Sequence, residues 1–194
     1  MKTKTFLIVM ILGFLPLSVS SQWGLKGGVD FGTLAGHDKA NYKVGFHAGA
    51  TYDFKLAEKF YLQPAALFSL YRFGFDESLL VKEGTVDKYS LEVPVNVSFR
   101  PTLTPSITLI IDLGLYAKYG LFGDTKYKMI DGESINKSSY DAYNRFDVGL
   151  NTGIGLGISR YYIGLAYQYG LTNGEKGISN FHNQIFRTSL GYKF

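Results

Sequence analysis

The amino-acid sequence predicts an all-β fold, an eight-stranded antiparallel up-and-down β-barrel. Apolar and polar residues alternate with a period of two along most of the chain, and short and long connections alternate between the alternating segments. The composition agrees, because 23 of the 194 residues are glycine, 16% are aromatic and only 19% are charged. Glycine is more frequent, and charge less frequent, than in an average globular domain.

The first 21 residues have the layout of a secretory signal peptide. A start with two lysines precedes an apolar run over residues 6–17, and small residues follow that run. The run is shorter than the roughly 20 apolar residues of a membrane-spanning helix, although an uncleaved anchor helix is the alternative. We therefore expect a signal peptide over residues 1–21 and one β-barrel domain over residues 22–194.

Composition also excludes several classes of function. A chain without cysteine has no disulfide framework, no thiolate metal site, no cysteine nucleophile and no lipid anchor on cysteine. The net charge of +4 falls to +2 when Lys2 and Lys4 leave with the signal peptide, so nucleic acid is not an expected partner. A mean hydropathy of +0.02 is too low for a polytopic helical membrane protein.

The alternation of faces is clearest between residues 90 and 100. One face there carries Leu91, Val93, Val95, Val97 and Phe99, and the other carries Ser90, Glu92, Asn96, Ser98 and Arg100. Such alternation is typical of a strand whose two faces meet different surroundings. The same analysis predicts eight strands, over residues 22–33, 43–55, 59–72, 87–100, 107–119, 143–158, 161–172 and 183–194.

The connections between these strands alternate strictly in length. The short ones are residues 56–58, 101–106 and 159–160, and the long ones are residues 34–42, 73–86, 120–142 and 173–182. All long connections therefore leave one end of an up-and-down structure. An even number of strands with short turns at one end and long loops at the other is typical of a transmembrane β-barrel of the outer membrane. Closure is required there, because lipid offers no partner to an open sheet edge.

A soluble lipocalin-like barrel is the alternative, and it would turn the apolar face inward. The polar face consists mainly of glycine and isolated charges, which would solubilise an outer surface poorly. The chain also ends on Phe194, within the last strand. Aromatic residues near strand ends predict the girdles of a membrane barrel, at Trp23, Phe31, Phe54, Phe60, Tyr61, Tyr119, Tyr143, Tyr161 and Tyr169. The transmembrane orientation, with the apolar face toward lipid, is therefore favoured.

With that orientation, charges of both signs point into the lumen. A barrel of eight strands is only wide enough to be filled by its own side chains, so we expect these charges to neutralise one another as buried pairs. A narrow ion path through the network is the alternative. The predicted network is Lys26, Asp30, His47, Asp53, Glu92, Arg100, Asp112, Lys118, Arg145, Asp147, Arg187 and Lys193.

Five segments carry a family resemblance. They are GLKGGVDFGTL at 24–34, GFHAGATYDFKLAEKFYLQPAALFS at 45–69, YSLEVPVNVSFRP at 89–101, GLAYQYGLTN at 164–173 and RTSLGYKF at 187–194. They resemble the outer-membrane β-barrel domain family of PorT-like and porin-like proteins of Gram-negative bacteria. The resemblance implies a barrel in the cell outer membrane. It also implies that the last strand, with Tyr192 and Phe194, is the assembly signal read by the barrel-assembly machinery.

Candidate catalytic residues are few. The candidates for a lipid-modifying enzyme are His37 with Asp38 and His182 with Ser179, in or beside the long loops. No surrounding motif of such an enzyme accompanies either combination. No metal-ligand spacing involves the histidines, and the charges of the longest loop lack the spacing of a calcium loop. We therefore expect no enzymatic activity, no metal and no cofactor.

A glycine cluster in the sixth predicted strand has a structural explanation. Gly153, Gly155 and Gly157 repeat with a period of two and lack the full spacing of a dinucleotide-binding loop. We expect these glycines to make room for a bulky lumen side chain such as Tyr162 or Arg187.

The leading functional hypothesis is a barrel that presents four long loops at the cell surface, in a structural, adhesive or partner-binding role. The alternative is a narrow channel or a component of a secretion apparatus. The resemblance to PorT-like proteins implies a part in protein secretion. The expected partners are outer-membrane lipid, lipopolysaccharide, the barrel-assembly machinery and an unidentified extracellular partner.

Overall fold

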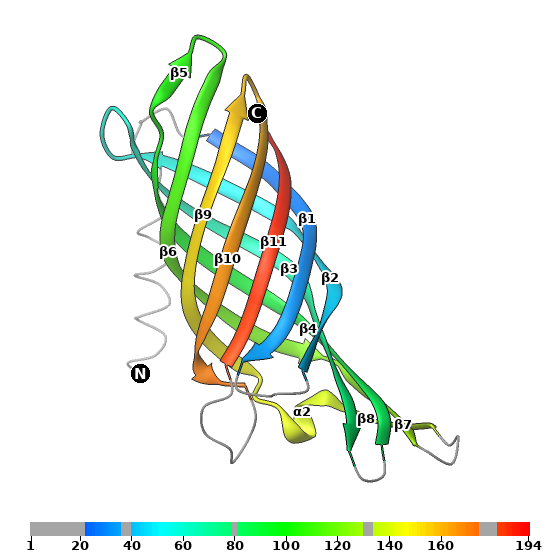
Figure 1. The fold of residues 1–194 in the computed structure, drawn as a ribbon. Helices are drawn as coiled ribbons and strands as arrows, with labels where there is room; N and C mark the ends of the chain where they lie inside the picture. Colours follow the sequence, from blue (N-terminus) through cyan, green and yellow to red (C-terminus); the bar gives the residue numbers. More distant parts are fainter. Residues whose placement is uncertain (1–21, 36–39, 79–80, 130–133, 175–181) are drawn as a thin grey trace, which may run out of the picture.

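The computed structural model describes residues 22–35, 40–78, 81–129, 134–174 and 182–194 (Figure 1). The predicted signal peptide, residues 1–21, lies outside this part of the chain. Within the described residues, no helix combines the length and the apolar character that a membrane crossing requires.

Eight long antiparallel strands close into a barrel, as predicted (Figure 1). Each strand pairs with its neighbours in the order of the chain, and β1 pairs with β11 from Gly24↔Lys193 to Ala35↔His182, which closes the wall. The barrel strands are β1 (Gln22–Ala35), β2 (Ala40–Lys55), β3 (Phe60–Ser78), β4 (Val81–Phe99), β6 (Ile107–Phe122), β9 (Phe146–Ile158), β10 (Tyr161–Asn173) and β11 (His182–Lys193).

The strands extend further at the long-loop end than the sequence predicts. Within the expected loop 73–86, residues 73–78 form the end of β3 and residues 81–86 form the start of β4. The expected loop 120–142 contains β7 (Asp124–Met129), β8 (Ser134–Ser138) and α2 (Ser139–Ala142). Cross-strand pairing overrides the loop-like composition here, because β7 pairs with β4 and β8 with β7.

We call this extension of the wall the platform: the ends of β3 and β4 from residues 74 and 87 outward, together with β7 and β8. It leaves the barrel at the lower right of Figure 1. At the opposite end, a three-residue strand, β5 (Thr102–Thr104), pairs with the start of β6 inside the predicted short turn. Short turns and long connections therefore do lie at opposite ends of the barrel.

The two faces of the wall have the predicted orientation. On β4, the side chains of Leu91, Val93 and Val97 are 41–48% exposed on the outside, whereas Glu92 and Ser98 are 0% exposed inside. Large exposed apolar side chains occur on every barrel strand. The apolar outer surface and polar interior are the reverse of a soluble lipocalin-like barrel, and they suit a barrel surrounded by lipid.

Aromatic side chains gather on the outer wall near both ends. At the short-turn end, the rings of Trp23 and Tyr52 lie 4.8 Å apart, and those of Tyr161 and Tyr192 lie 5.4 Å apart. Toward the long-loop end, the ring of Tyr89 stacks on that of Phe122 at 4.7 Å. This arrangement resembles the two aromatic girdles of membrane barrels.

Two residues expected in the girdles lie inside instead. Tyr61 faces the lumen, where the Arg100 guanidinium lies 4.4 Å from its ring centre. Tyr143 is 7% exposed and packs edge-on against Phe73 at 5.3 Å. Tyr61 occupies an inward-facing position of β3, and Tyr143 lies between α2 and the start of β9. Nearness to a strand end therefore did not predict the side of the wall on which either ring lies.

We predict that Val95→Arg destabilises the barrel by about 2–4 kcal/mol, because the charge would enter the middle of the apolar wall. Val95 is 39% exposed and lies between the aromatic groups at the two ends of β4. Urea unfolding of the protein in lipid bilayers measures the change, with Val95→Leu as the apolar control. An Arg variant as stable as the Leu variant would mean that this face does not meet lipid.

Candidate functional site

The centre of the lumen is an ion-pair cluster around Arg187 of β11. Its Nε and Nη2 atoms donate to the Asp30 carboxylate of β1, both at 2.9 Å. Its Nη1 and Nη2 atoms donate to the Glu92 carboxylate of β4 at 2.9 and 3.1 Å. All three side chains are at least 96% buried. One guanidinium therefore links three strands across the barrel.

Further side chains complete the coordination of these two carboxylates. His47 Nδ1 lies 2.7 Å from Asp30 Oδ1, and the other ring nitrogen lies 3.0 Å from the Ser189 hydroxyl. Gln168 donates to Glu92 at 2.7 Å, and Lys118 Nζ lies 3.3 Å from the same carboxylate. Each carboxylate thus has several partners, as a buried charge requires.

A second cluster surrounds Asp53 toward the short-turn end. The guanidinium of Arg100 donates two hydrogen bonds to its carboxylate at 2.6 and 2.8 Å. Lys193 and Gln63 donate to it at 2.7 and 2.6 Å. The bidentate geometry is the strongest form of a guanidinium–carboxylate pair.

Two predicted lumen residues lie between these clusters without a direct salt bridge among the described residues. Asp112 accepts a hydrogen bond from Ser98. The Lys26 ammonium lies 4.9 Å from the ring centre of Tyr162, where the π face attracts it.

The third cluster lies toward the long-loop end. Asp147 accepts hydrogen bonds from Tyr116, Thr172 and Asn183 at 3.0, 2.7 and 2.9 Å. Nearby, the Lys88 ammonium faces the rings of Tyr71 and Tyr143 at 5.3 and 5.6 Å.

An apolar plug lies next to this third cluster, on its long-loop side. It consists of Tyr71, Phe73, Val86, Tyr143 and Ile185, all between 0 and 7% exposed. The plug is fixed in place because the Tyr71 hydroxyl donates to the backbone carbonyl of Thr33. Charges fill the middle of the lumen, and packed rings fill its long-loop end.

The structure brings together all predicted members of the charge network except Arg145. That side chain is exposed, donates to the carbonyls of Gly120 and Leu121 at 3.0 and 2.9 Å, and covers the Tyr140 ring. Arg145 precedes the first residue of β9, so the alternation of that strand does not fix its direction. Arg145 lines one small cavity with Lys88, Lys118 and Asp147 at the long-loop end of the lumen, but among the described residues it makes no ion pair with the network.

Sequence reasoning missed the buried cation Lys88, which is 5% exposed. The signal was present, since Lys88 has the same parity as Ser90 and Glu92 within the predicted strand over residues 87–100. The Lys88 ammonium lies against the rings of Tyr71 and Tyr143, and the sequence pattern did not indicate these aromatic partners.

Of the three glycines in the predicted cluster, Gly155 has the expected role, because Tyr162 packs against it, whereas Gly153 and Gly157 face Ala166 and Ile110. A Cβ atom at Gly155 or Gly164 would collide with the Tyr162 side chain, which packs against the inner side of the wall. The two glycines, on β9 and β10, pair with each other in the sheet. They therefore make room in the lumen for one large ring.

The platform is fixed to the barrel by buried hydrogen bonds. The hydroxyls of Thr125 and Ser139 lie 2.9 Å apart, and Ser139 donates to the Asp87 carbonyl at 2.9 Å. Arg72 makes a bidentate pair with the Asp87 carboxylate at 2.5 and 2.8 Å. The base of the platform is thus ordered.

Helix α2 contributes a further anchor. The Tyr140 hydroxyl donates to the carbonyl of Tyr89 at 3.1 Å. Burial raises the pKa of Tyr140 above its ordinary value, so the donated proton is retained. Beyond this anchor, the side chains of Asp124, Lys126 and Lys128 are exposed on one face of β7.

The candidate catalytic pairs fall mostly beyond the described residues, which do not include His37, Asp38 or Ser179. His182 is described, and its ring lies 5.4 Å from that of Tyr169 on the outer wall. In the part of the chain that the structure describes, no group of three or more His, Asp or Glu side chains could hold a metal ion.

Comparisons with known proteins agree with this architecture. Residues 18–174 match the family model of an outer membrane protein beta-barrel domain. The fold is similar to that of Neisserial surface protein A, at 11% identity over 91% of this chain and 100% of that chain, with a TM-score of 0.51.

Ail, the attachment invasion locus protein of Yersinia pestis, is 21% identical over 91% of this chain and 100% of that chain, with a TM-score of 0.48. OprG from Pseudomonas aeruginosa is 14% identical over 90% and 96%, with a TM-score of 0.49. No curated protein sequence matches the chain.

We predict that Arg187→Met lowers the free energy of unfolding by about 3–5 kcal/mol, because two buried carboxylates lose their shared cation. Urea titration of the folded protein in detergent measures this change. Lys59→Met, at an exposed turn position, is the control and should change stability by no more than about 0.5 kcal/mol. Equal stability of the two variants would show that the central cluster does not support the fold.

Proposed function

The chain belongs to the outer membrane protein beta-barrel domain family, and from this we propose that it is a non-conducting outer-membrane anchor that presents the platform at the cell surface. In this role it is structural, adhesive or partner-binding. The barrel supplies a rigid base in the membrane, and contacts with other molecules are made by the platform and the neighbouring long connections.

The continuity of the wall with the platform is the observation that carries this proposal. Strands β3 and β4 are 19 residues long, whereas about 9–11 tilted residues cross the hydrocarbon. The excess lies entirely at the long-loop end, where β7 and β8 widen the sheet. A sheet of this kind offers a broad surface at a fixed distance from the membrane.

The packing of the lumen supports an anchor over a channel. Three buried clusters around Arg187, Asp53 and Asp147 occupy successive levels, and the apolar plug follows at the long-loop end. An ion path would require several of these pairs to separate inside the barrel, where an unpaired charge is costly. A narrow channel therefore remains the second hypothesis.

The narrower expectations stay predictions. These are the PorT-like resemblance with its part in secretion, export by the signal peptide, the absence of enzymatic activity, and the contacts with lipopolysaccharide and the barrel-assembly machinery. For the assembly signal, the Phe194 amide donates to the Trp23 carbonyl at 3.0 Å, and its ring contacts that of Tyr192. The terminal residue is thus built into the wall beside β1.

We predict that Lys126→Cys reacts with a membrane-impermeant maleimide on intact cells. Lys126 is an exposed residue of the platform, and the natural chain contains no cysteine that would react in the background. Ser106→Cys, at the short-turn end, is the matched control and should react only after the outer membrane is permeabilised. Labelling of Ser106→Cys alone on intact cells would invert the proposed orientation.

We also predict that the purified barrel produces no current steps in a planar lipid bilayer, because its lumen is filled. A variant in which residues 126–136 are replaced by Asn-Gly keeps the pairing of Thr125 with Lys137 and shortens the platform to a tight hairpin. This variant should be equally silent. Discrete steps in either protein, with a faster-migrating folded band on an unboiled gel, would favour the channel.

A further inference from the structure

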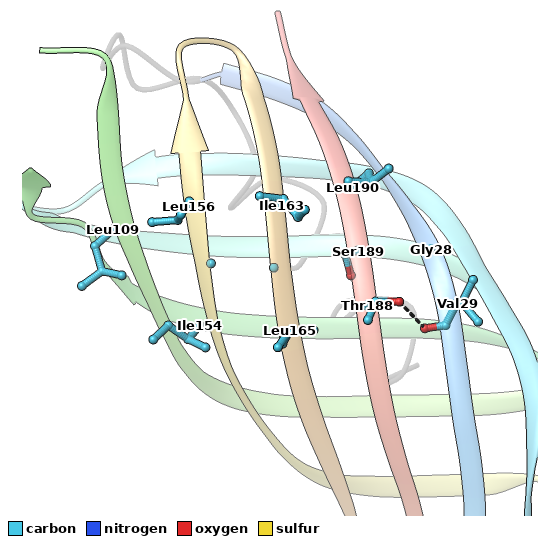
Figure 2. Close-up of a pocket in the computed structure, with 12 residues that line it drawn as sticks. Gly28, Val29, Leu109, Ile154, Leu156, Ile163, Leu165, Thr188, Ser189 and Leu190 are labelled. Atoms are coloured by element: carbon cyan, nitrogen blue, oxygen red, sulfur yellow. Dashed lines mark hydrogen bonds between the residues drawn. The ribbon is translucent and has the colours of Figure 1, made fainter. Parts of the chain in front are cut away.

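An apolar hollow with a volume of about 660 Å³ lies on the outer wall (Figure 2). It spans strands β6, β9, β10, β11 and β1 on the lipid-facing side. One row of side chains borders it toward the short-turn end, with Leu156, Ile163 and Leu190 in cross-strand register. A second row borders it on the other side, with Ile154 and Leu165 in register.

The floor of the hollow is the outward side of the backbone at four residues whose side-chain positions face the lumen. Gly155, Gly164, Ser189 and Gly28 follow one another in register across four strands, between the two rows. The glycines that accommodate Tyr162 inside the barrel therefore also line the hollow outside it. The volume lies within the range of pockets that bind small molecules.

The hollow offers almost no polar group to an occupant. Thr188 is the polar side chain on its outward-facing border, and its hydroxyl donates to the Val29 carbonyl at 3.4 Å (Figure 2). That proton is therefore used within the wall. An occupant must be apolar over the length of the hollow.

A positive charge lies close to one end. Arg160 is an exposed residue of the β9–β10 turn, four residues from Leu156 and three from Ile163. At the rise of a strand this corresponds to about 10–13 Å. The Arg160 guanidinium donates to the Tyr192 hydroxyl at 3.4 Å, and Tyr161 is 66% exposed beside it. A cation with two phenols at the membrane boundary suits a phosphate group.

We propose that the hollow retains one phospholipid, with an acyl chain between the two rows of side chains and its phosphate against Arg160. The choice of phospholipid over lipopolysaccharide rests on the proposed function, which turns the short turns toward the periplasm. Both lipids carry phosphate and acyl chains, so the leaflet decides between them.

The headgroup contact must contribute much of the retention. Lipid tails are as apolar as leucine, so an acyl chain gains little from leaving bulk lipid for an apolar wall. A charge-assisted hydrogen bond to phosphate distinguishes this position from the rest of the wall. Removal of the Arg160 charge should therefore release the lipid even though the hollow is intact.

A second copy of the chain fits the hollow less well. A two-fold symmetric contact places the same patch of both copies together. Two concave surfaces would then face each other, and neither would be filled. A flexible acyl chain can follow the hollow and fill it.

The experiment is native mass spectrometry of the full folded protein, extracted from outer membranes in mild detergent. Two variants test the two parts of the site. Thr188→Phe fills the hollow from an outward position, and Arg160→Gln removes the headgroup contact. Val97→Phe, outward on β4, and Lys59→Gln, in the β2–β3 turn, are the matched controls. Migration of unboiled samples on a gel verifies that every variant is folded.

We expect one bound phospholipid on the wild-type protein and on both controls, and at least a fivefold lower bound fraction on Thr188→Phe and Arg160→Gln. Absence of lipid from the wild type, or equal retention by Thr188→Phe, would overturn the proposal. Bound lipid A would reject the phospholipid source. A dimer that Thr188→Phe dissociates would assign the hollow to a second copy. Cysteine labelling tests the orientation independently of all these outcomes.

Discussion

The contact of Arg187 with both Asp30 and Glu92 is the interaction on which the interior depends. It joins β11 to β1 and β4, and its partners are separated from it by 157 and 95 positions in the chain. Because an eight-stranded barrel has little room for water, a cation at this position needs carboxylates on the facing strands. The cluster around Asp53 repeats this solution with Arg100 and Lys193, whereas the Asp147 carboxylate is held by the neutral donors Tyr116, Thr172 and Asn183.

This crowding also shapes the outside of the wall. Tyr162 occupies lumen space that opens only where β9 and β10 carry Gly155 and Gly164. The same two glycines form part of the floor of the outer hollow, so the residues that accommodate Tyr162 inside also belong to the lipid-facing surface. Packing inside the lumen and the shape of the outer surface are coupled because the wall between them is a single layer of backbone.

The sequence predicted the faces of the strands better than the contacts between them. Alternation is a property of one strand, so it assigned Asp30, Glu92 and Arg187 to the lumen without reference to the rest of the chain. Their mutual pairing depends on the register of three strands, which alternation does not determine. Tyr143 was placed on the wrong face because it lies just outside β9, where the alternation of that strand does not apply. The platform was missed because Gly, Asp and Lys in residues 73–86 and 120–142 suggest loops.

The platform differs from a loop in one respect that bears on its proposed role. Its base is held by the Arg72–Asp87 pair and by the Thr125–Ser139 contact, so its position relative to the barrel is fixed before any partner arrives. A surface ordered in advance loses less conformational entropy on binding than a flexible loop does. The apolar plug that includes Phe73 and Tyr143 closes the lumen next to the base of the platform. A sealed interior and an ordered outer sheet are therefore two results of the same packing at the long-loop end.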